Sequence, residues 1–492
     1  MLQGRWPVRM RPNELPVSAW RQWVREFVQH IHFVGIGGAG MSGIASVLLD
    51  QGYQVSGSDA VDSATVQRLA GQGAKVCIGH AAEQIVAADV VVVSAAITDD
   101  NPELVLARAT GIPVIPRAEM LGELMRFRQG IAVAGTHGKT TTTSLIASIL
   151  AAGGLDPTFV VGGLVNSVQG NARLGSGDFL VAEADESDAS FLRLHPCVAV
   201  ITNIDADHMD TYDGDFNRLV EAFLDFLHNL PFYGLAVLCA DDPVVQKLRG
   251  QLKKPSITYG FQGDADYRAS DVRQVGPRTR FSAHRPQGES IQIDLALPGI
   301  HNVQNALAAV AICDKLGVAP DHVAKGLSSF EGIARRFEIL GCLPCRSGSA
   351  ILVDDYAHHP REVSATLDAA RACWPHQDLL VVFQPHRYSR TRDLFDDFVE
   401  LLASETRLLV CEVYPAGETP IAGADGLSLC HAIRGRGKTD PVFVENVFDL
   451  PDLLTPLLRP DDVLLTLGAG NIGRVARELI ETLNGWPTGT DE

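Results

Sequence analysis

The feature that most limits how this chain folds is a short apolar run that leads through a glycine-rich turn into a helix. Residues 131–134 are apolar, residues 135–140 read Gly-Thr-His-Gly-Lys-Thr, and apolar residues from 145 to 150 recur at helical spacing. Such a unit directs backbone N–H groups and a helix N-terminus at one point, which suits phosphate oxygens. Lys139 adds a positive charge for β- and γ-phosphates, and the Thr140 hydroxyl suits Mg²⁺. We predict a nucleotide phosphate site here, although Val133 stands where the common P-loop has its first glycine.

A second glycine turn lies near the N-terminus and follows another predicted strand. Gly35, Gly37 and Gly40 fit the Gly-x-Gly-x-x-Gly spacing, and Asp59 ends the next strand at about the distance of a ribose-binding acid. Ser94 ends the valine run 90–93, at the sheet edge where open α/β sheets bind ligands. This pattern predicts a diphosphate on a helix N-terminus and leaves the nucleotide undefined.

Two predicted strands in the middle of the chain end in acidic residues. Residues 179–183 lead into Asp185, Glu186 and Asp188, and residues 198–204 lead into a segment that contains Asp205 and His208. Carboxylates beside a phosphate loop favour Mg²⁺, which takes few protein ligands and shares the rest with water and phosphate. Solvated acidic turns without a ligand are the alternative.

The last third again alternates strands with helices. It carries Asp-Asp-Tyr-Ala-His-His-Pro at 354–360 and Gln-Pro-His-Arg-Tyr-Ser-Arg-Thr at 384–391, each after a predicted strand. Arg387 and Arg390 are suited to a carboxylate, and a zinc site formed by the histidines at 358, 359 and 386 is a weaker alternative. Before this part, Asn302 and Asn305 share the first turn of a predicted helix, where they either cap the helix or bind a purine edge. A further Gly-x-Gly-x-x-Gly at 468–473 is interpreted mainly as strand-to-helix packing.

Composition indicates an ordinary globular enzyme. Apolar residues make up 46% and charged residues 20% of 492, a length that favours roughly three domains. The net charge of −18 argues against nucleic acid and anionic membrane surfaces. The nine scattered cysteines and the absence of a long apolar run favour a cytoplasmic protein. Residues 1–30, with arginines among tryptophans, are interpreted as an extension without function, and Cys342-x-x-Cys345 as chance spacing.

Taken together, these motifs resemble the Mur ligase family of peptidoglycan synthesis. The resemblance runs from about residue 31 to the C-terminus, and His137 with the Asp-His-Met-Asp-Thr-Tyr run resembles the members that add L-alanine to UDP-N-acetylmuramate. Sister ligases carry a carbamylated lysine soon after the histidine of that run, which is His208 here. Residues 209–234 contain no lysine, so that modification is not inferred. The matching stretches are residues 35–43, 135–141, 183–188, 206–210, 301–306, 355–360 and 384–391.

The resemblance implies an α/β fold of three domains, each built on a mainly parallel sheet: Rossmann-like, P-loop ATPase-like and Rossmann-like. After the extension, the expected boundaries are 31–126 for the UDP sugar, 127–334 for ATP and 335–492 for the amino acid. The implied reaction joins L-alanine to the carboxylate of UDP-N-acetylmuramate through an acyl phosphate, with ATP and Mg²⁺. No nucleic-acid or membrane partner is implied.

The resemblance also implies residue roles. Catalysis would involve Lys139, His208, Arg336 and His358, and the metal would be held by Thr140, Glu183 and His208. ATP would contact Gly135, Thr136, His137, Gly138, Lys139, Thr140, Thr141, Asn302, Asn305, Arg336 and Asp355. The UDP sugar and amino acid would contact Gly35, Gly37, Gly38, Gly40, Asp59, Ser94, Tyr356, His358, His386, Arg387 and Arg390.

Two alternatives of different kinds remain. One is a sister ligase, either the enzyme that reattaches a recycled tripeptide to the same UDP sugar or folylpolyglutamate synthetase. The other is a dinucleotide-dependent oxidoreductase, which the two Gly-x-Gly-x-x-Gly turns suggest. The oxidoreductase leaves Lys139 and the acidic strand ends without a role.

Overall fold

The computed structural model describes residues 27–484 except 169, 346 and 347, and these form two compact units. Of the described residues, unit 1 comprises those up to Tyr267 together with Ala308–Gly326, and unit 2 comprises Arg268–Leu307 together with those from Leu327 onward. The interpretation of the N-terminal extension falls mostly outside the described residues.

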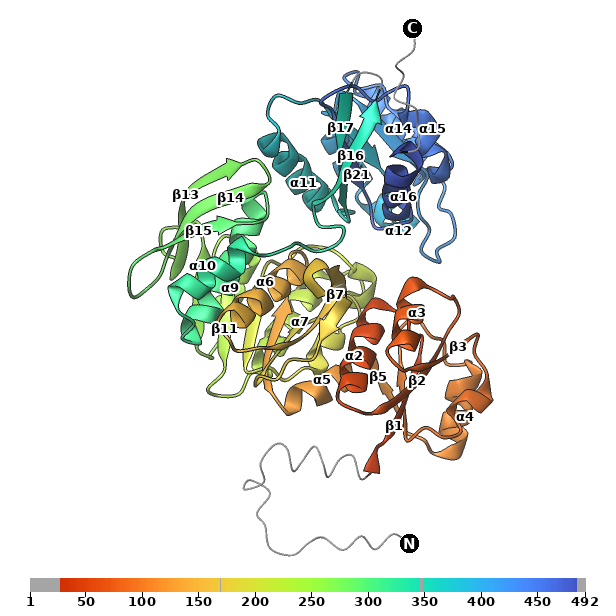
Figure 1. The fold of residues 1–492 in the computed structure, drawn as a ribbon, viewed down its shortest axis with the longest axis vertical. Helices are drawn as coiled ribbons and strands as arrows, with labels where there is room; N and C mark the ends of the chain where they lie inside the picture. The colour runs from red at the N-terminus through yellow and green to blue at the C-terminus, as the bar shows by residue number, and fades with distance from the viewer. Residues whose placement is uncertain (1–26, 169, 346–347, 485–492) are drawn as a thin grey trace, which may run out of the picture. The chain divides into compact units, whose positions relative to one another are not determined.

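Unit 1 begins with a five-stranded parallel sheet in the order β3-β2-β1-β4-β5. Its segments are drawn in red and orange in Figure 1. Helices cover both faces of this sheet, which explains why its strand β4 is a run of four valines. The glycine turn at 35–38 connects β1 to α2, as predicted from sequence. The elements are β1 (His30–Val34), α2 (Ala39–Asp50), β2 (Gln54–Asp59), α3 (Ala64–Gly71), β3 (Lys75–Ile78), β4 (Val90–Val93), α4 (Pro102–Thr110), β5 (Val114–Pro116) and α5 (Arg117–Arg126).

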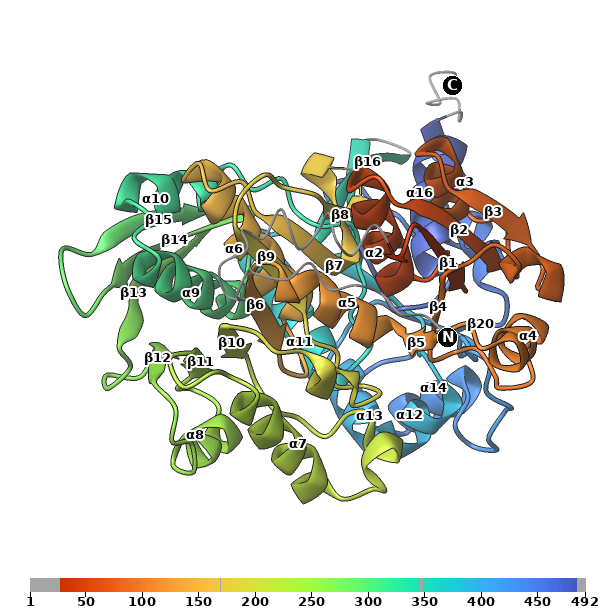
Figure 2. The same ribbon diagram turned by 90° about the horizontal axis from the view of Figure 1, so that it is seen from below.

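The second sheet of unit 1 runs in the order β12-β11-β10-β6-β9-β7-β8, and β8 alone among these strands is antiparallel to its neighbour. Helix α6 packs along β7 and β9 (Figure 2). Because β6 lies between β9 and β10, the carboxyl ends of all three strands meet at one edge of the sheet. The elements are β6 (Gln129–Ala134), α6 (Lys139–Ala152), β7 (Thr158–Val165), β8 (Gly170–Arg173), β9 (Phe179–Glu183), β10 (Val198–Ile201), α7 (Phe216–His228), β11 (Leu235–Cys239), α8 (Pro243–Arg249) and β12 (Ser256–Gly260).

The two sheets of unit 1 are joined by packing of α2 against β7 and β8. Gly43 lies at this contact, where a Cβ would come within 3.2 Å of Val160. The Asn171 amide donates to the Ser42 hydroxyl at 2.9 Å across the same contact. The glycine turn that precedes α2 is therefore fixed to the second sheet.

Unit 2 contains an antiparallel ribbon and a six-stranded sheet in the order β16-β17-β21-β18-β19-β20. Only β16 in that sheet is antiparallel to its neighbour, and apolar clusters cover both faces. The ribbon is β13 (Tyr267–Val275), β14 (Arg278–His284) and β15 (Ile291–Leu295), followed by α9 (Ile300–Lys315) and α10 (Pro320–Ser328), helices that both extend across a boundary between the units. The sheet and its helices are β16 (Glu338–Cys345), β17 (Gly348–Asp355), α11 (Pro360–Cys373), β18 (Leu379–Phe383), α12 (Tyr388–Asp393), α13 (Phe395–Leu402), β19 (Leu408–Cys411), α14 (Gly426–Gly435), β20 (Val442–Val444), α15 (Leu450–Leu454), β21 (Val463–Leu467) and α16 (Ile472–Asn484).

The predicted fold class is confirmed: three domains of α/β type, built on mainly parallel sheets. The exact boundaries expected between the domains stay predictions. Within the described residues, no helix has both the length and the apolar character needed to cross a membrane.

Candidate active site

The predicted phosphate loop joins β6 to α6 and requires glycine at two positions. Gly135 has φ +128° and Gly138 has φ +83°, both in the region that favours glycine. A Cβ on Gly135 would lie 2.0 Å from the Thr202 hydroxyl oxygen, so no side chain fits there. Helix α6 begins at Lys139, directly after the turn. The loop thus ends on a helix N-terminus, the geometry that binds phosphate.

The segment after β10 holds this loop in place, a role that the sequence did not reveal. The Thr202 hydroxyl donates to the His137 carbonyl at 2.6 Å. The Asn203 side chain both accepts from the His137 N–H at 2.8 Å and donates to its carbonyl at 3.0 Å. His137 also pairs through its ring with Asp205 at 3.3 Å. The loop therefore follows β6 and is held by residues that follow the adjacent strand β10. The polar residues directly after β10 were the sequence signal that could have indicated this role.

The Lys139 ammonium group has three acceptors inside unit 1. It donates to the carbonyls of Gly135 at 2.7 Å and Thr136 at 3.0 Å, and to the Glu186 carboxylate at 2.9 Å. Burial lowers the Lys139 pKa, but the charges of Glu186 and Asp185 outweigh it and leave the pKa raised. Lys139 is therefore a cation at any physiological pH. Sequence reasoning grouped Glu186 with the neighbouring acids and did not single it out as the partner.

The predicted metal ligands lie at the same sheet edge. Thr140 is in the first turn of α6, and Glu183 ends β9, the strand next to β6. The Oε1 atom of Glu183 is buried and receives no hydrogen bond from any described residue. His208 follows β10 with φ +55°, and its ring lies 3.5 Å from the Asp207 carboxylate. A buried carboxylate oxygen without a donor, beside a phosphate loop, is the kind of atom that a divalent cation satisfies.

The N-terminal glycine turn is held by residues that were predicted to contact substrate. Asp59 accepts from the Gly37 N–H at 2.8 Å and from the Val61 N–H at 3.1 Å. Ser94 lies against Gly35, where a Cβ would come within 3.4 Å of the serine Cβ. Asp59 therefore fixes the turn itself, and its expected contact with a ribose stays a prediction.

Arg117 connects this turn to the acidic end of β9, and sequence reasoning missed it. Its guanidinium covers Gly40, where a Cβ would lie 2.6 Å from Nη1. The same group pairs with Asp185 at 3.2 Å and is one-fifth exposed. A partly exposed arginine between a glycine turn and a phosphate loop is suited to bind an anion. Arg117 lies outside both glycine motifs in the sequence, so neither motif indicated that it belongs to the site.

In unit 2, four predicted substrate-binding residues lie together with Tyr414. The His358 ring contacts those of Tyr356 and His386, with centroids 5.3 and 5.8 Å apart, and His386 stacks on Tyr414 at 5.5 Å. Arg390 donates to Nδ1 of His386 at 3.4 Å. Burial lowers the pKa of His386 to about 3, and the charge of Arg390 acts in the same direction. His386 is therefore a neutral acceptor.

Arg336, a predicted catalytic residue, lies over the Tyr356 ring at 5.3 Å from its centroid. Asp355 accepts from the Phe337 N–H at 2.6 Å and the Ala357 N–H at 2.8 Å. Burial raises the pKa of Asp355 to about 6, although the Arg336 charge and these backbone donors oppose the change. Asp355 therefore holds the backbone on both sides of the end of β17. The ring cluster, which consists of Tyr356, His358, His386 and Tyr414, begins at the next residue.

The second Gly-x-Gly-x-x-Gly has the structural role expected for it. The Arg335 guanidinium donates to the carbonyls of Gly468 and Gly470, and it pairs with buried Asp354 at 2.9 Å. A Cβ on Gly473 would lie 2.1 Å from Arg335 Nε. Gly473 therefore makes room for an arginine, and a Cβ on Gly468 or Gly470 would instead meet Gln384.

The other predicted residues of unit 2 make contacts within unit 2. Arg387 has φ +70° and donates through its N–H to the Tyr414 carbonyl at 2.9 Å. Asn302 donates to the Pro298 carbonyl at 2.7 Å, and Asn305 donates to Asn302 at 3.1 Å. His359, one of the alternative zinc ligands, caps the start of α11. For the asparagines, the structure shows the helix-start contacts, and the purine contact stays a prediction.

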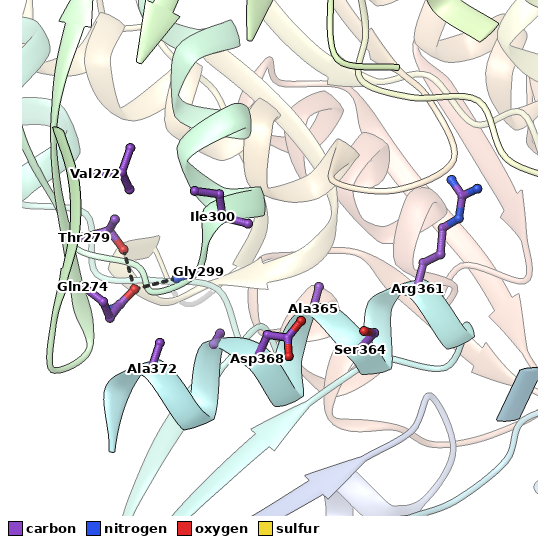
Figure 3. Close-up of a pocket in the computed structure, with 11 residues that line it drawn as sticks. Val272, Gln274, Thr279, Gly299, Ile300, Arg361, Ser364, Ala365, Asp368 and Ala372 are labelled. Atoms are coloured by element: carbon purple, nitrogen blue, oxygen red, sulfur yellow. Dashed lines mark hydrogen bonds between the residues drawn. The ribbon is translucent and has the colours of Figure 1, made fainter. Parts of the chain in front are cut away.

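A pocket of about 480 Å³ also lies in unit 2, between the β13–β14 ribbon, the start of α9 and one face of α11 (Figure 3). Gln274 braces it by accepting from the Thr279 hydroxyl at 3.0 Å and the Gly299 N–H at 3.1 Å. Alanines of α11 form much of its wall, and no predicted site residue lines it.

Comparison with known proteins gives consistent results. Three models of Mur ligase family domains match the chain in order: the catalytic domain at residues 30–129, the middle domain at 133–313 and the glutamate ligase domain at 335–470. The UDP-N-acetylmuramate–alanine ligase of Thermotoga maritima is 30% identical, with a TM-score of 0.80 over 92% of this chain and 99% of that one. A murein peptide ligase of Psychrobacter arcticus is 23% identical, with a TM-score of 0.69 over 93% and 99%. A folylpolyglutamate synthase of Mycobacterium tuberculosis is 18% identical, with a TM-score of 0.58 over 75% and 93%.

Because three family domains match in chain order and a relative at 30% identity aligns along 99% of its length, the chain belongs to the Mur ligase family of amide-forming ligases.

Proposed function

We propose that this enzyme joins L-alanine to the lactyl carboxylate of UDP-N-acetylmuramate, with ATP converted to ADP and phosphate. The observation that carries the proposal is the likeness to the Thermotoga maritima alanine ligase, which extends along almost the whole of both chains. We assign the UDP sugar to segment 31–126, ATP to segment 127–334 and the amino acid to segment 335–492. Each of these segments contains one of the residue clusters described above.

The phosphoryl-transfer half of the reaction is assigned to the loop at 135–141. Its backbone N–H groups and the α6 N-terminus would hold the phosphates, and Lys139 would neutralise the charge that develops on the γ-phosphoryl group. The substrate carboxylate attacks the γ-phosphorus, ADP leaves, and an acyl phosphate forms. Arg117 and the glycine turn at 35–40 are suited to the diphosphate of the UDP sugar.

Mg²⁺ fits the residues at this edge. Glu183 offers a buried oxygen without a hydrogen-bond donor, and Thr140 and His208 offer one ligand atom each. When bound, the ion would neutralise phosphate oxygens and polarise the γ-phosphoryl group.

The amide-forming half is assigned to the ring cluster of unit 2. Arg387 or Arg390 would bind the alanine carboxylate, and Tyr356, His358 and His386 would surround the amine and methyl group. Nδ1 of His358 lies 3.0 Å from the Tyr356 carbonyl, and donation to that carbonyl would make Nε2 the proton acceptor. The amine attacks the acyl carbon, phosphate leaves, and the surplus amine proton passes to a base such as Nε2 of His358.

The test is phosphate release from ATP with UDP-N-acetylmuramate and one amino acid at a time, including L-alanine, glycine and L-serine. A further reaction contains L-alanyl-γ-D-glutamyl-meso-diaminopimelate, the peptide in the name of a Neisseria relative at 28% identity that covers 63% of this chain. The proposal expects the highest kcat/KM with L-alanine. A preference for the tripeptide would assign the chain to the tripeptide ligases instead.

A further inference from the structure

The proposed nucleotide site contains a buried acid to which the proposed reaction assigns no role. Glu186 is 2% exposed, lies in the turn after β9, and faces Lys139. The Lys139 Nζ atom donates to its Oε1 at 2.9 Å and lies 2.8 Å from its Oε2. Both carboxylate oxygens of a buried acid are therefore within contact of the lysine that is assigned to the phosphates.

The donor count of Lys139 makes this contact significant. An ammonium group has three N–H donors. Two are directed at the carbonyls of Gly135 and Thr136, which belong to the loop backbone, and the third is directed at Glu186. For a phosphate oxygen to receive a hydrogen bond from Nζ, one of these acceptors must be given up. Glu186 is the one that is a side chain and carries the same sign of charge as the phosphate.

The backbone around Glu186 is fixed. The Tyr212 hydroxyl donates to its carbonyl at 2.5 Å, and the Ala189 N–H donates to the same carbonyl at 3.0 Å. Asp185, directly before it, pairs with Arg117 and accepts from the Ser187 N–H. The carboxylate can therefore change its contact with Lys139 by side-chain rotation alone, while the turn stays in place.

We propose that Glu186 is a positioning residue that occupies Lys139 in the empty protein and competes with the nucleotide phosphates for it. This inference rests on the proposed function, since it requires a nucleotide at the 135–141 loop. In the empty site, the carboxylate keeps the largely buried ammonium group paired and in place. When phosphate arrives, Lys139 exchanges one anion for another, and the repulsion between Glu186 and the phosphate lowers affinity for the nucleotide.

The experiment measures ADP affinity of the full chain by calorimetry, first with EDTA and then with Mg²⁺. Glu186→Gln removes the competing charge and keeps the shape, so it should bind ADP about tenfold more tightly, which corresponds to about 1.4 kcal/mol. Glu119→Gln is the matched control, because it breaks a half-exposed ion pair with Arg193 in the same unit and should leave ADP affinity unchanged.

Equal or weaker ADP binding by Glu186→Gln in EDTA would overturn the inference. Loss of affinity only with Mg²⁺ would also overturn it and would make Glu186 a metal ligand. If wild type itself binds no ADP, the proposed nucleotide site fails instead. Thermal melting gives a second readout: the empty variant should melt below wild type, because Lys139 loses the carboxylate that it contacts, and ADP should raise its Tm by more. Glu186→Asp, with a shorter carboxylate, should lie between the two.

Discussion

Replacing Gly135 by alanine should disable the phosphate loop without unfolding the protein. The residue has φ +128°, a conformation that costs a non-glycine residue about 1–3 kcal/mol. The added Cβ would also lie 2.0 Å from the Thr202 hydroxyl oxygen. Moving that hydroxyl breaks its hydrogen bond to the His137 carbonyl, at a further cost of about 1 kcal/mol.

These contributions sum to about 2–4 kcal/mol, and the loop avoids most of that cost if it changes shape. A displaced loop no longer presents its N–H groups to the phosphates. We therefore expect kcat/KM for ATP to fall roughly 30- to 700-fold, at tenfold per 1.4 kcal/mol. The assay is steady-state phosphate release with ATP varied, together with circular dichroism melting to show that the chain is folded.

Gly154→Ala is the control for backbone strain alone. Gly154 has φ +77° at the far end of the same helix, and a Cβ there meets open space. This variant should lose about 1–2 kcal/mol of stability and keep its ATP kinetics. ATP kinetics of Gly135→Ala within threefold of wild type would refute the reasoning, because they would show that the loop accepts a side chain at this position.

Further predictions concern the metal, the amino acid and pH. Glu183→Gln should raise the Mg²⁺ concentration needed for half-maximal rate, and a wild-type Mg²⁺ titration would make that residue structural. Arg387→Ala or Arg390→Ala should raise the KM for L-alanine roughly 30- to 150-fold, since a charge-assisted carboxylate contact contributes about 2–3 kcal/mol, and no change in either variant would place the clamp elsewhere. Burial raises the pKa of Glu186 to about 7, against the opposing charge of its lysine partner, so the acid is ionised and competes with phosphate mainly above pH 7. The ratio of ADP dissociation constants, wild type over Glu186→Gln, should therefore fall towards one as pH is lowered from about 8.5 to 5.5; a ratio that does not change with pH contradicts this. The His386 ring should stay neutral down to about pH 4, because its pKa is lowered to about 3, and an NMR titration midpoint near 6.5 would contradict the burial argument.

The glycine turns and their flanking elements could be predicted from sequence because their signals are local. A strand, two glycines in unusual backbone conformations and a helix with apolar residues at helical spacing are contiguous at 129–152, and the structure has β6 and α6 there. The ribbon β13–β15 was not predicted, since its strands are partly exposed and their pairing is not local.

The partners within the site could be predicted only in part. Glu183 ends β9 and acids follow at 185, 186 and 188, and the sequence does not indicate which of them pairs with Lys139. The turn selects Glu186, because Asp185 is held by the Ser187 N–H and Arg117. Asn203 supports the phosphate loop only because β10 lies beside β6, and that neighbour relation is a property of the folded sheet.

The most direct test of the proposed reaction follows an oxygen atom. UDP-N-acetylmuramate carrying oxygen-18 in its lactyl carboxylate is incubated with the enzyme, ATP, Mg²⁺ and L-alanine, and the products are analysed by mass spectrometry. The proposed mechanism predicts UDP-N-acetylmuramoyl-L-alanine together with phosphate that has gained a single oxygen-18 atom, because that oxygen bridges carbon and phosphorus in the acyl phosphate. Unlabelled phosphate would contradict it. ATP consumption that continues without L-alanine and is not coupled to amide formation would also contradict it.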